Sequence, residues 1–226
     1  MNKEKYSLLE NYMLSCMQDS AHDKAHVYRV LYSATEIAAA EENVDMDILI
    51  AACLLHDIAR SEQFADPNVC HARAGAVKAS EFLLANGFDN EFAYKVAHCI
   101  KTHRFRNDDP PTSIEAKILF DADKLDVTGA TGIARTLLYA GEMSEVLYSL
   151  DENGMVSDGE HDTEPSFFHE YHFKLKRLYE RFYTKKGREL AESRRQAAAN
   201  FYEDMLREVR YAYVDGKKEL EKYVNT

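Results

Sequence analysis

The chain has 226 residues, 46% of them hydrophobic, which is enough to fill the core of one large domain. Its formal net charge of -11, from 39 acidic and 28 basic residues, disfavours general binding to nucleic acid or to a membrane surface. The N-terminal stretch mixes charged and apolar residues, and no apolar run approaches the roughly 18 residues of a membrane span, so we expect a cytoplasmic protein. Four cysteines in no CxxC pair indicate reduced, mostly buried thiols: Cys16, Cys53, Cys70 and Cys99.

Helical periodicity dominates the chain from end to end. Apolar residues recur at helical spacing almost everywhere, and alternating β-branched runs are scarce. Only four prolines and nine glycines interrupt the pattern. The sequence therefore predicts an all-α fold, with helices over about 4–18, 23–42, 46–60, 69–86, 89–104, 112–140, 165–184 and 187–213.

Turn-forming residues mark the breaks between these helices. Gly87 stops one helix and Asp89 caps the next, while Ser113 is placed to start the helix after it. The longest polar stretch, "LDENGMVSDGEHDTEP", is either a mobile lid or a solvated connection, and the connection is the more common use of such a loop. We expect one domain over 1–226.

A His-Asp pair ends the most apolar predicted helix. His56 and Asp57 follow the run "ILIAACLL". Neighbours on a helix point about 100° apart, so both serve one site only where helix ends cross and something such as a metal ion lies between them. His-Asp also occurs at 22–23 and 161–162, where polar surroundings indicate the surface. The context of the pair must therefore decide its meaning.

Two further residues supply that context. His26 lies on the preceding predicted helix, and Asp123 lies on a later one, in "KILFDADKLDVTGATGIAR". Two imidazoles and two carboxylates form a mixed N/O ligand set that suits Mn, Fe, Ni, Co or Zn and leaves positions open for water and substrate.

In this order the residues resemble the H…HD…D signature of the HD-domain metal-dependent phosphohydrolases, an all-helical superfamily. The stretches "HDKAHVYRV", "AACLLHDIAR", "HARAGAVKASEFL", "IKTHRFR" and "DADKLDVTGATGIAR" look like those of its small single-domain bacterial members, as do "FFHEYHFKLKRL" and "LAESRRQAAANFYEDML". The resemblance covers about residues 20–210. It implies an HD-domain core over 20–142, with C-terminal helices from 143–226 packing over it.

The resemblance also implies the ligand set and the reaction. His26, His56, Asp57 and Asp123 would bind a divalent metal ion, with Mn first and Fe, Ni, Co, Zn or Mg as alternatives; Asp121 is the rival for the last place. His56 and Asp57 would carry the catalytic centre. The metal would polarise a phosphoryl oxygen and acidify water, which makes the expected protein a phosphoester or phosphoanhydride hydrolase.

Further side chains are candidates for contacting the phosphate, because the developing negative charge needs cations or hydrogen-bond donors. His71 and His103 would contact phosphate or transfer a proton, or hold a second metal; the alternatives are a helix-entry residue and a helix C-terminal residue. Nine of the 28 basic residues fall between 174 and 195. The candidates for substrate contact are His71, His103, Arg104, Lys124, Lys174 and Arg194.

The leading substrate is a nucleotide, because similar small HD proteins remove pyrophosphate from nucleoside or deoxynucleoside triphosphates. A cyclic-nucleotide phosphodiesterase or a nucleotidase needs the same metal centre, and a nucleotide-binding module without turnover is a third alternative. The expected partner is a small phosphorylated molecule, with a homodimer possible for a helical protein of this size.

Overall fold

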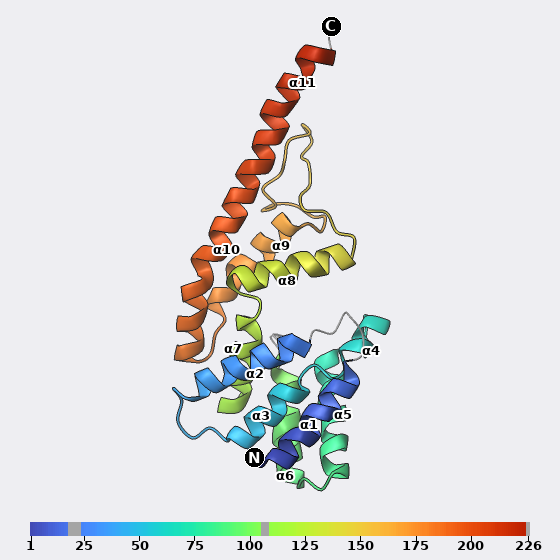
Figure 1. Ribbon diagram of the computed structural model, residues 1–226, viewed down its shortest axis with the longest axis vertical. Coiled ribbons are helices and arrows are strands. Elements are labelled where there is room, and N and C mark those ends of the chain that lie inside the picture. The colour runs from blue at the N-terminus through green and yellow to red at the C-terminus, as the bar shows by residue number, and fades with distance from the viewer. Residues whose placement is uncertain (18–23, 105–108, 225–226) are drawn as a thin grey trace. The chain divides into compact units, whose positions relative to one another are not determined.

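The computed structural model describes residues 1–17, 24–104 and 109–224. Within these ranges the chain is all-α, as the sequence predicts, with two isolated β-bridges and no strand. None of its helices there combines the length and apolar character needed to cross a membrane. Figure 1 labels the α-helices and leaves the two short helices η1 and η2 without a label. The helices are α1 (Lys3–Cys16), α2 (Lys24–Ala38), α3 (Met46–Leu55), α4 (Arg60–Ala65), α5 (His71–Ala85), α6 (Asn90–Thr102), α7 (Ile114–Leu125), α8 (Gly129–Glu142), α9 (Phe167–Phe173), the 3-10 helix η1 (Leu175–Glu180), α10 (Lys185–Tyr211), the π-helix η2 (Ala212–Gly216) and α11 (Lys217–Val224).

The chain divides into two compact units. Unit 1 contains Met1–Asp126 and Phe182–Arg188, and unit 2 contains Val127–Arg181 and Glu189–Thr226. The division after Asp126 lies earlier than residue 142, where the sequence placed the end of the core. The single-domain organisation stays a prediction.

Helix α3 is the centre of unit 1. It is apolar on every side, and it packs against α1, α2, α6 and α7. Asp45 caps its start by accepting hydrogen bonds from the backbone N–H groups of Asp47 and Ile48. The helix ends at Leu55, earlier than the predicted residue 60, and α4 follows as a separate short helix. A buried helix of this kind fixes the position of whatever follows its last residue.

The helix predicted over about 112–140 is two helices, α7 and α8. Ser113 starts α7 as expected, its hydroxyl accepting from the backbone N–H of Ala116. The break falls between Asp126 and Gly129, where Gly129 has φ +60°. A Cβ atom on Gly132 would lie 2.3 Å from the carbonyl oxygen of Val127, so only glycine allows this tight turn. Periodicity missed the break because the apolar pattern continues across it.

Aromatic side chains build the core of unit 2. The ring of Tyr171 stacks on that of Tyr202 at 4.0 Å between centroids. The helix predicted over about 165–184 is interrupted at Lys174, whose backbone leaves the α-helical region at φ -125° and ψ -59°. The remaining buried residues of this core are Ile133, Val156, Phe167, Phe168, Leu175, Leu178 and Ala198.

The long polar stretch after α8 is a loop held together by hydrogen bonds between its own residues. The hydroxyl groups of Ser149 and Ser157 both donate to the carboxylate of Asp162. The backbone N–H of Phe167 donates to the carbonyl of Val146, which ties the start of the loop to its end. The Asp162 carboxylate therefore stabilises the loop, which gives the His-Asp pair at 161–162 a local structural role. The other such pair, at 22–23, lies outside the described residues.

All four cysteines are free thiols. Cys53 and Cys99 are buried, and Cys16 and Cys70 are partly exposed. Burial raises the pKa of Cys99 to about 12, so this thiol stays protonated and unreactive.

Candidate metal centre

Four side chains from three parts of unit 1 converge on one point. His26 comes from α2, His56 and Asp57 directly follow α3, and Asp123 comes from the last turn of α7. Nε2 of His26 lies 3.3 Å from Nε2 of His56. The same nitrogen lies 3.5 Å from Oδ2 of Asp57 and 3.4 Å from Oδ1 of Asp123. The four predicted ligands thus present two nitrogens and two oxygens to each other in a buried place.

The outer nitrogen of each imidazole in this first cluster is bonded away from the centre. Nδ1 of His56 lies 2.8 Å from the carbonyl oxygen of Cys53, which can only accept, so Nδ1 carries the proton. Nδ1 of His26 lies 2.7 Å from Oδ2 of Asp126. A neutral ring protonated at Nδ1 has its lone pair on Nε2. In their neutral forms both rings therefore direct the Nε2 lone pair at the shared centre, as metal ligation requires. Burial lowers the pKa of His26, but Asp123 and Asp57 outweigh this effect and raise that pKa.

The other oxygen of Asp57 faces a second cluster. Its Oδ1 lies 3.4 Å from Nε2 of His71 and 3.8 Å from Nε2 of His103. The two imidazole nitrogens are 3.2 Å apart. His26, His56 and Asp123 form one group of potential metal ligands, and Asp57, His71 and His103 form another. Asp57 lies between the two groups, with one oxygen facing each.

The second cluster repeats the outward bonding of the first. Nδ1 of His103 lies 2.5 Å from the carbonyl oxygen of Ile100, and Nδ1 of His71 lies 2.6 Å from Oε1 of Gln63. Both rings again direct Nε2 inward. Two inward lone pairs at this separation repel unless a proton or a cation lies between them.

Burial and mutual charge shift the ionisation of these groups. Burial lowers the pKa of His71 to about 2 and that of His103 to about 4, so both rings are neutral at pH 7. Burial also opposes ionisation of Asp57, but the Arg60 guanidinium and His56 outweigh it and hold the pKa of Asp57 well below its usual value. For Asp123, burial likewise opposes ionisation, and Lys124, His26 and His103 together outweigh it and lower the pKa. Neutral imidazoles and ionised carboxylates are the ligand forms of a divalent cation.

Two predicted phosphate contacts lie beside these clusters. Lys124 donates from Nζ to Oδ2 of Asp123 at 2.9 Å and lies 4.9 Å from the centre of the Phe120 ring. Arg104 follows His103, and its Nη1 is buried with no hydrogen-bond partner among the residues that the structure describes. A buried guanidinium nitrogen without a partner costs free energy, which an anionic ligand would recover.

Asp121, the rival for the fourth ligand, is engaged elsewhere. Its Oδ2 accepts from the backbone N–H and the hydroxyl of Thr184 at 2.7 and 2.6 Å, and its Oδ1 accepts from the backbone N–H of Tyr183 at 2.9 Å. A Cβ atom on Gly187 would meet Oδ2 of Asp121 at 2.6 Å. Asp121 thus binds the Phe182–Arg188 segment into unit 1, and the geometry favours Asp123 as the ligand.

Lys174 and Arg194, the remaining predicted contacts, lie in unit 2, whereas both clusters lie in unit 1. Lys174 is exposed, and its Nζ lies 2.8 Å from Oε1 of Glu170. The Cβ of Arg194 lies so close to Gly129 that a Cβ there would meet it at 2.8 Å. Lys174 thus has a local partner, and contact of either side chain with substrate stays a prediction.

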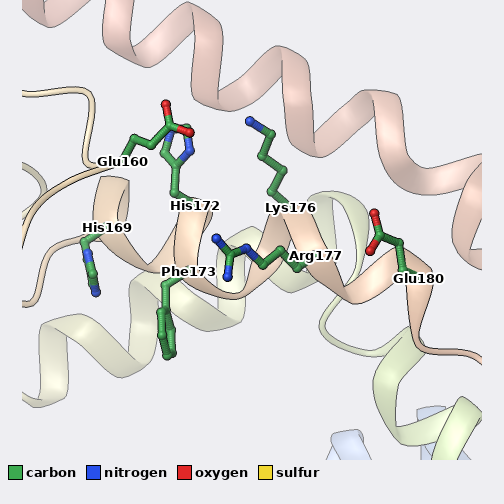
Figure 2. A pocket seen from close by; sticks show the side chains of 7 residues that line it. All are labelled: Glu160, His169, His172, Phe173, Lys176, Arg177 and Glu180. Atoms are coloured by element: carbon green, nitrogen blue, oxygen red, sulfur yellow. The ribbon is translucent and has the colours of Figure 1, made fainter.

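Unit 2 has a polar pocket of its own, of about 210 Å³. The residues that line it recur at helical spacing along α9 and η1, and Glu160 comes from the preceding loop (Figure 2). Two cationic and two anionic side chains offset each other there, so the pocket has no net preference for an anion. Its lining is Glu160, His169, His172, Phe173, Lys176, Arg177 and Glu180.

Comparisons with known proteins identify the family. YpgQ of Bacillus subtilis is 32% identical to the chain over 196 residues, which are 85% of the chain and 86% of YpgQ. A model of the HD domain matches residues 24–128, which include both clusters. The chain belongs to the HD superfamily. Its fold superposes with a TM-score of 0.69 on the structure of YpgQ in complex with ADP, at 28% identity over 91% of the chain and 95% of YpgQ. The TM-score is 0.68 for an HD-superfamily hydrolase from Bacillus thuringiensis, at 30% identity over 91% of the chain and 97% of that protein.

Membership of the HD superfamily implies a hydrolase with a divalent metal ion. The residues present fit such an ion: nitrogen and oxygen donors of the first cluster lie within 4.8 Å of one another. The donor atoms of the second cluster also lie within 4.8 Å of one another, so that cluster fits a divalent ion as well.

Several residues that support the clusters were not assigned from the sequence. Asp126 accepts from His26 and also from Nε of Arg29 at 2.6 Å, and Gln63 accepts from His71. Asp126 lies in the quoted "DADKLD", so its position three residues after Asp123, on the same helix face, was an available signal. Gln63 gave no signal, because only the tertiary structure brings it to His71.

Proposed function

We propose that the chain is a metal-dependent phosphohydrolase that acts on a nucleotide, with pyrophosphate release from a nucleoside or deoxynucleoside triphosphate as the leading reaction. The observation that carries this proposal is the convergence of two inward imidazole lone pairs and two carboxylates in a buried place. The structure of the relative YpgQ in complex with ADP supports a nucleotide as the ligand.

His26, His56, Asp57 and Asp123 would hold a divalent cation, which when bound would supply Lewis acidity toward a phosphoryl oxygen and lower the pKa of water. The residues around it do the rest. Arg104 has a guanidinium nitrogen with no hydrogen-bond partner in the described part of the chain, which suits a phosphoryl oxygen and opposes its developing charge.

His71 and His103 are better suited to accept a hydrogen bond than to neutralise a phosphate. Both rings bond outward through Nδ1 and turn an unprotonated Nε2 inward. An imidazole in this form accepts a hydrogen bond from water or from a protonated phosphate oxygen. Lys124, already next to Asp123, contributes positive charge at the edge of the same centre.

The test is a product assay with substituted ligands. The chain, stripped of metal and reloaded with Mn²⁺, is incubated with nucleoside and deoxynucleoside triphosphates, monophosphates and cyclic nucleotides, and pyrophosphate and orthophosphate are measured. We expect pyrophosphate from a triphosphate. Orthophosphate alone would identify a nucleotidase, an opened cyclic ester a phosphodiesterase, and affinity without product a binding module.

The substitutions His56→Ala, Asp57→Ala and Asp123→Asn should each lower turnover at least about 100-fold and lower bound metal, because loss of even an outer partner of a ligand costs about 10–100-fold. His161→Ala is the matched control, since His161 precedes an aspartate in the same way but is exposed in the loop of unit 2. Full activity of His56→Ala would contradict the proposed centre.

A further inference from the structure

Asp57 serves two clusters through different oxygens, and the two oxygens have different neighbours. Oδ2 lies 3.5 Å from Nε2 of His26 and 3.6 Å from Nε2 of His56. Oδ1 lies 3.4 Å from Nε2 of His71. Oδ1 also accepts a hydrogen bond from Nε of Arg60 at 3.0 Å. One side of the carboxylate is thus bonded to a permanent cation.

Arg60 is connected to the second cluster by a further bond. Its Nη1 lies 3.4 Å from Oε1 of Gln63, which lies three residues later in α4. The same oxygen accepts from Nδ1 of His71 at 2.6 Å. Arg60 therefore donates to Oδ1 of Asp57 and to Oε1 of Gln63, the acceptor that orients His71. Asp57 and His71 both belong to the group that could hold a second cation.

A cation in the second cluster would have to share Oδ1 with this guanidinium. The positive charge of Arg60 repels a divalent ion at short range and reduces the charge that Oδ1 offers to it. Among the described contacts of Oδ2, no guanidinium appears. In the first cluster Lys124 bonds Oδ2 of Asp123, whereas Oδ1 of Asp123 is the oxygen that faces His26. In the second cluster Arg60 bonds the same oxygen of Asp57 that faces His71. The two clusters therefore differ in whether a cation occupies the inward-facing carboxylate oxygen.

We propose that Arg60 makes the two clusters unequal, so that the first binds a divalent cation tightly and the second binds one only weakly. This inference rests on the metal centre of the proposed function. It assigns Arg60 as the residue that sets how many cations the centre holds. The role is one of position and charge, since Arg60 itself ligates nothing.

The pair has the character of a functional contact more than of a stabilising one. The Arg60 side chain is 38% exposed, and α4 has no buried residue. An ion pair with one partner this exposed contributes little to folding. We therefore expect Arg60→Gln to fold normally.

The experiment counts Mn²⁺ ions. The metal-free full-length chain is titrated with Mn²⁺ by calorimetry, and the loaded protein is examined by electron paramagnetic resonance, which distinguishes an isolated Mn²⁺ from a spin-coupled pair. We expect one tight ion in the unsubstituted chain, with any second ion bound at least tenfold more weakly. Arg60→Gln should tighten the second ion at least tenfold and give the signal of a coupled pair.

Three further variants make the result specific. Arg60→Lys keeps the charge and should retain one tight ion. Lys101→Gln removes a positive charge from the same unit, where Nζ of Lys101 lies 2.7 Å from Oδ2 of Asp109. This variant should also retain one tight ion. Adding His71→Ala to Arg60→Gln should abolish the second ion, which places that ion in the second cluster.

Each contrary result has a distinct meaning. Two ions bound with equal affinity in the unsubstituted chain would overturn the role of Arg60, as would an unchanged count in Arg60→Gln. Survival of the second ion after His71→Ala would overturn its assignment to this cluster. No tight ion in any variant would instead refute the metal centre on which the proposed function rests.

Discussion

The orientation of each imidazole in the two clusters is fixed by its outer nitrogen. Carbonyl oxygens of Cys53 and Ile100 hold two of the rings, and side chains hold the other two. Backbone acceptors cannot be removed by substitution, whereas Asp126 and Gln63 can. The two side-chain acceptors are therefore the places where ligand geometry is open to test.

Replacing Asp126 with Asn should weaken metal binding by about 10–100-fold, because the amide can donate to Nδ1 of His26 and so favour the ring form that is protonated at Nε2. Mn²⁺ affinity by calorimetry and the nitrogen chemical shifts of His26 measure both parts of this effect. The burial of Asp126 and its contact with Arg29 make the folded state depend on it too, so the tautomer signal is the deciding readout.

Arg29→Gln is the control for that experiment. It removes the guanidinium from Asp126 but leaves the carboxylate to accept from His26. We expect the His26 tautomer to persist and the Mn²⁺ affinity to fall less than in Asp126→Asn. An unchanged His26 spectrum in Asp126→Asn would refute the positioning role.

At the scale of the helices, the turn between α7 and α8 decides where the chain leaves unit 1. Asp123 and Asp126 both lie within a few residues of this turn, so its geometry also determines the position of one ligand and the partner of another. The tight contact of Gly132 with the backbone of Val127 is what the turn depends on.

Gly132→Ala should destabilise the protein by about 1–3 kcal/mol, because the new Cβ meets backbone atoms that cannot rotate away. Gly141→Ala is the matched control in the same helix: a Cβ there has nothing within 4 Å, and alanine favours the helix by about 0.5–1 kcal/mol. Urea denaturation monitored by circular dichroism measures both changes. Equal effects of the two substitutions would show that the turn does not need glycine.

For the whole molecule, a metal that binds the folded chain stabilises it by mass action. At a free Mn²⁺ concentration of 100 times Kd, the gain in the free energy of unfolding is about 2.7 kcal/mol. The midpoint temperature of thermal denaturation should therefore rise when Mn²⁺ is added and fall back to its metal-free value when a chelator is added. His56→Ala should show no such shift, and a shift of the same size in that variant would place the metal elsewhere.

The sequence alone predicted the all-α class and singled out His26, His56, Asp57 and Asp123 as candidate ligands. Both predictions were possible because apolar periodicity and short motifs are local properties of a chain. Continuous periodicity could not show the break at Gly129 or the interruption at Lys174, which depend on close packing and on backbone conformation.

Only the tertiary structure decided which oxygen of Asp57 faces which cluster, that Arg60 is bonded to one of them, and that Asp121 holds a distant segment. Such assignments depend on the direction of single side chains from helices far apart in the chain. Their physical basis is the packing of α2, α3, α6 and α7 against one another, which no local pattern contains.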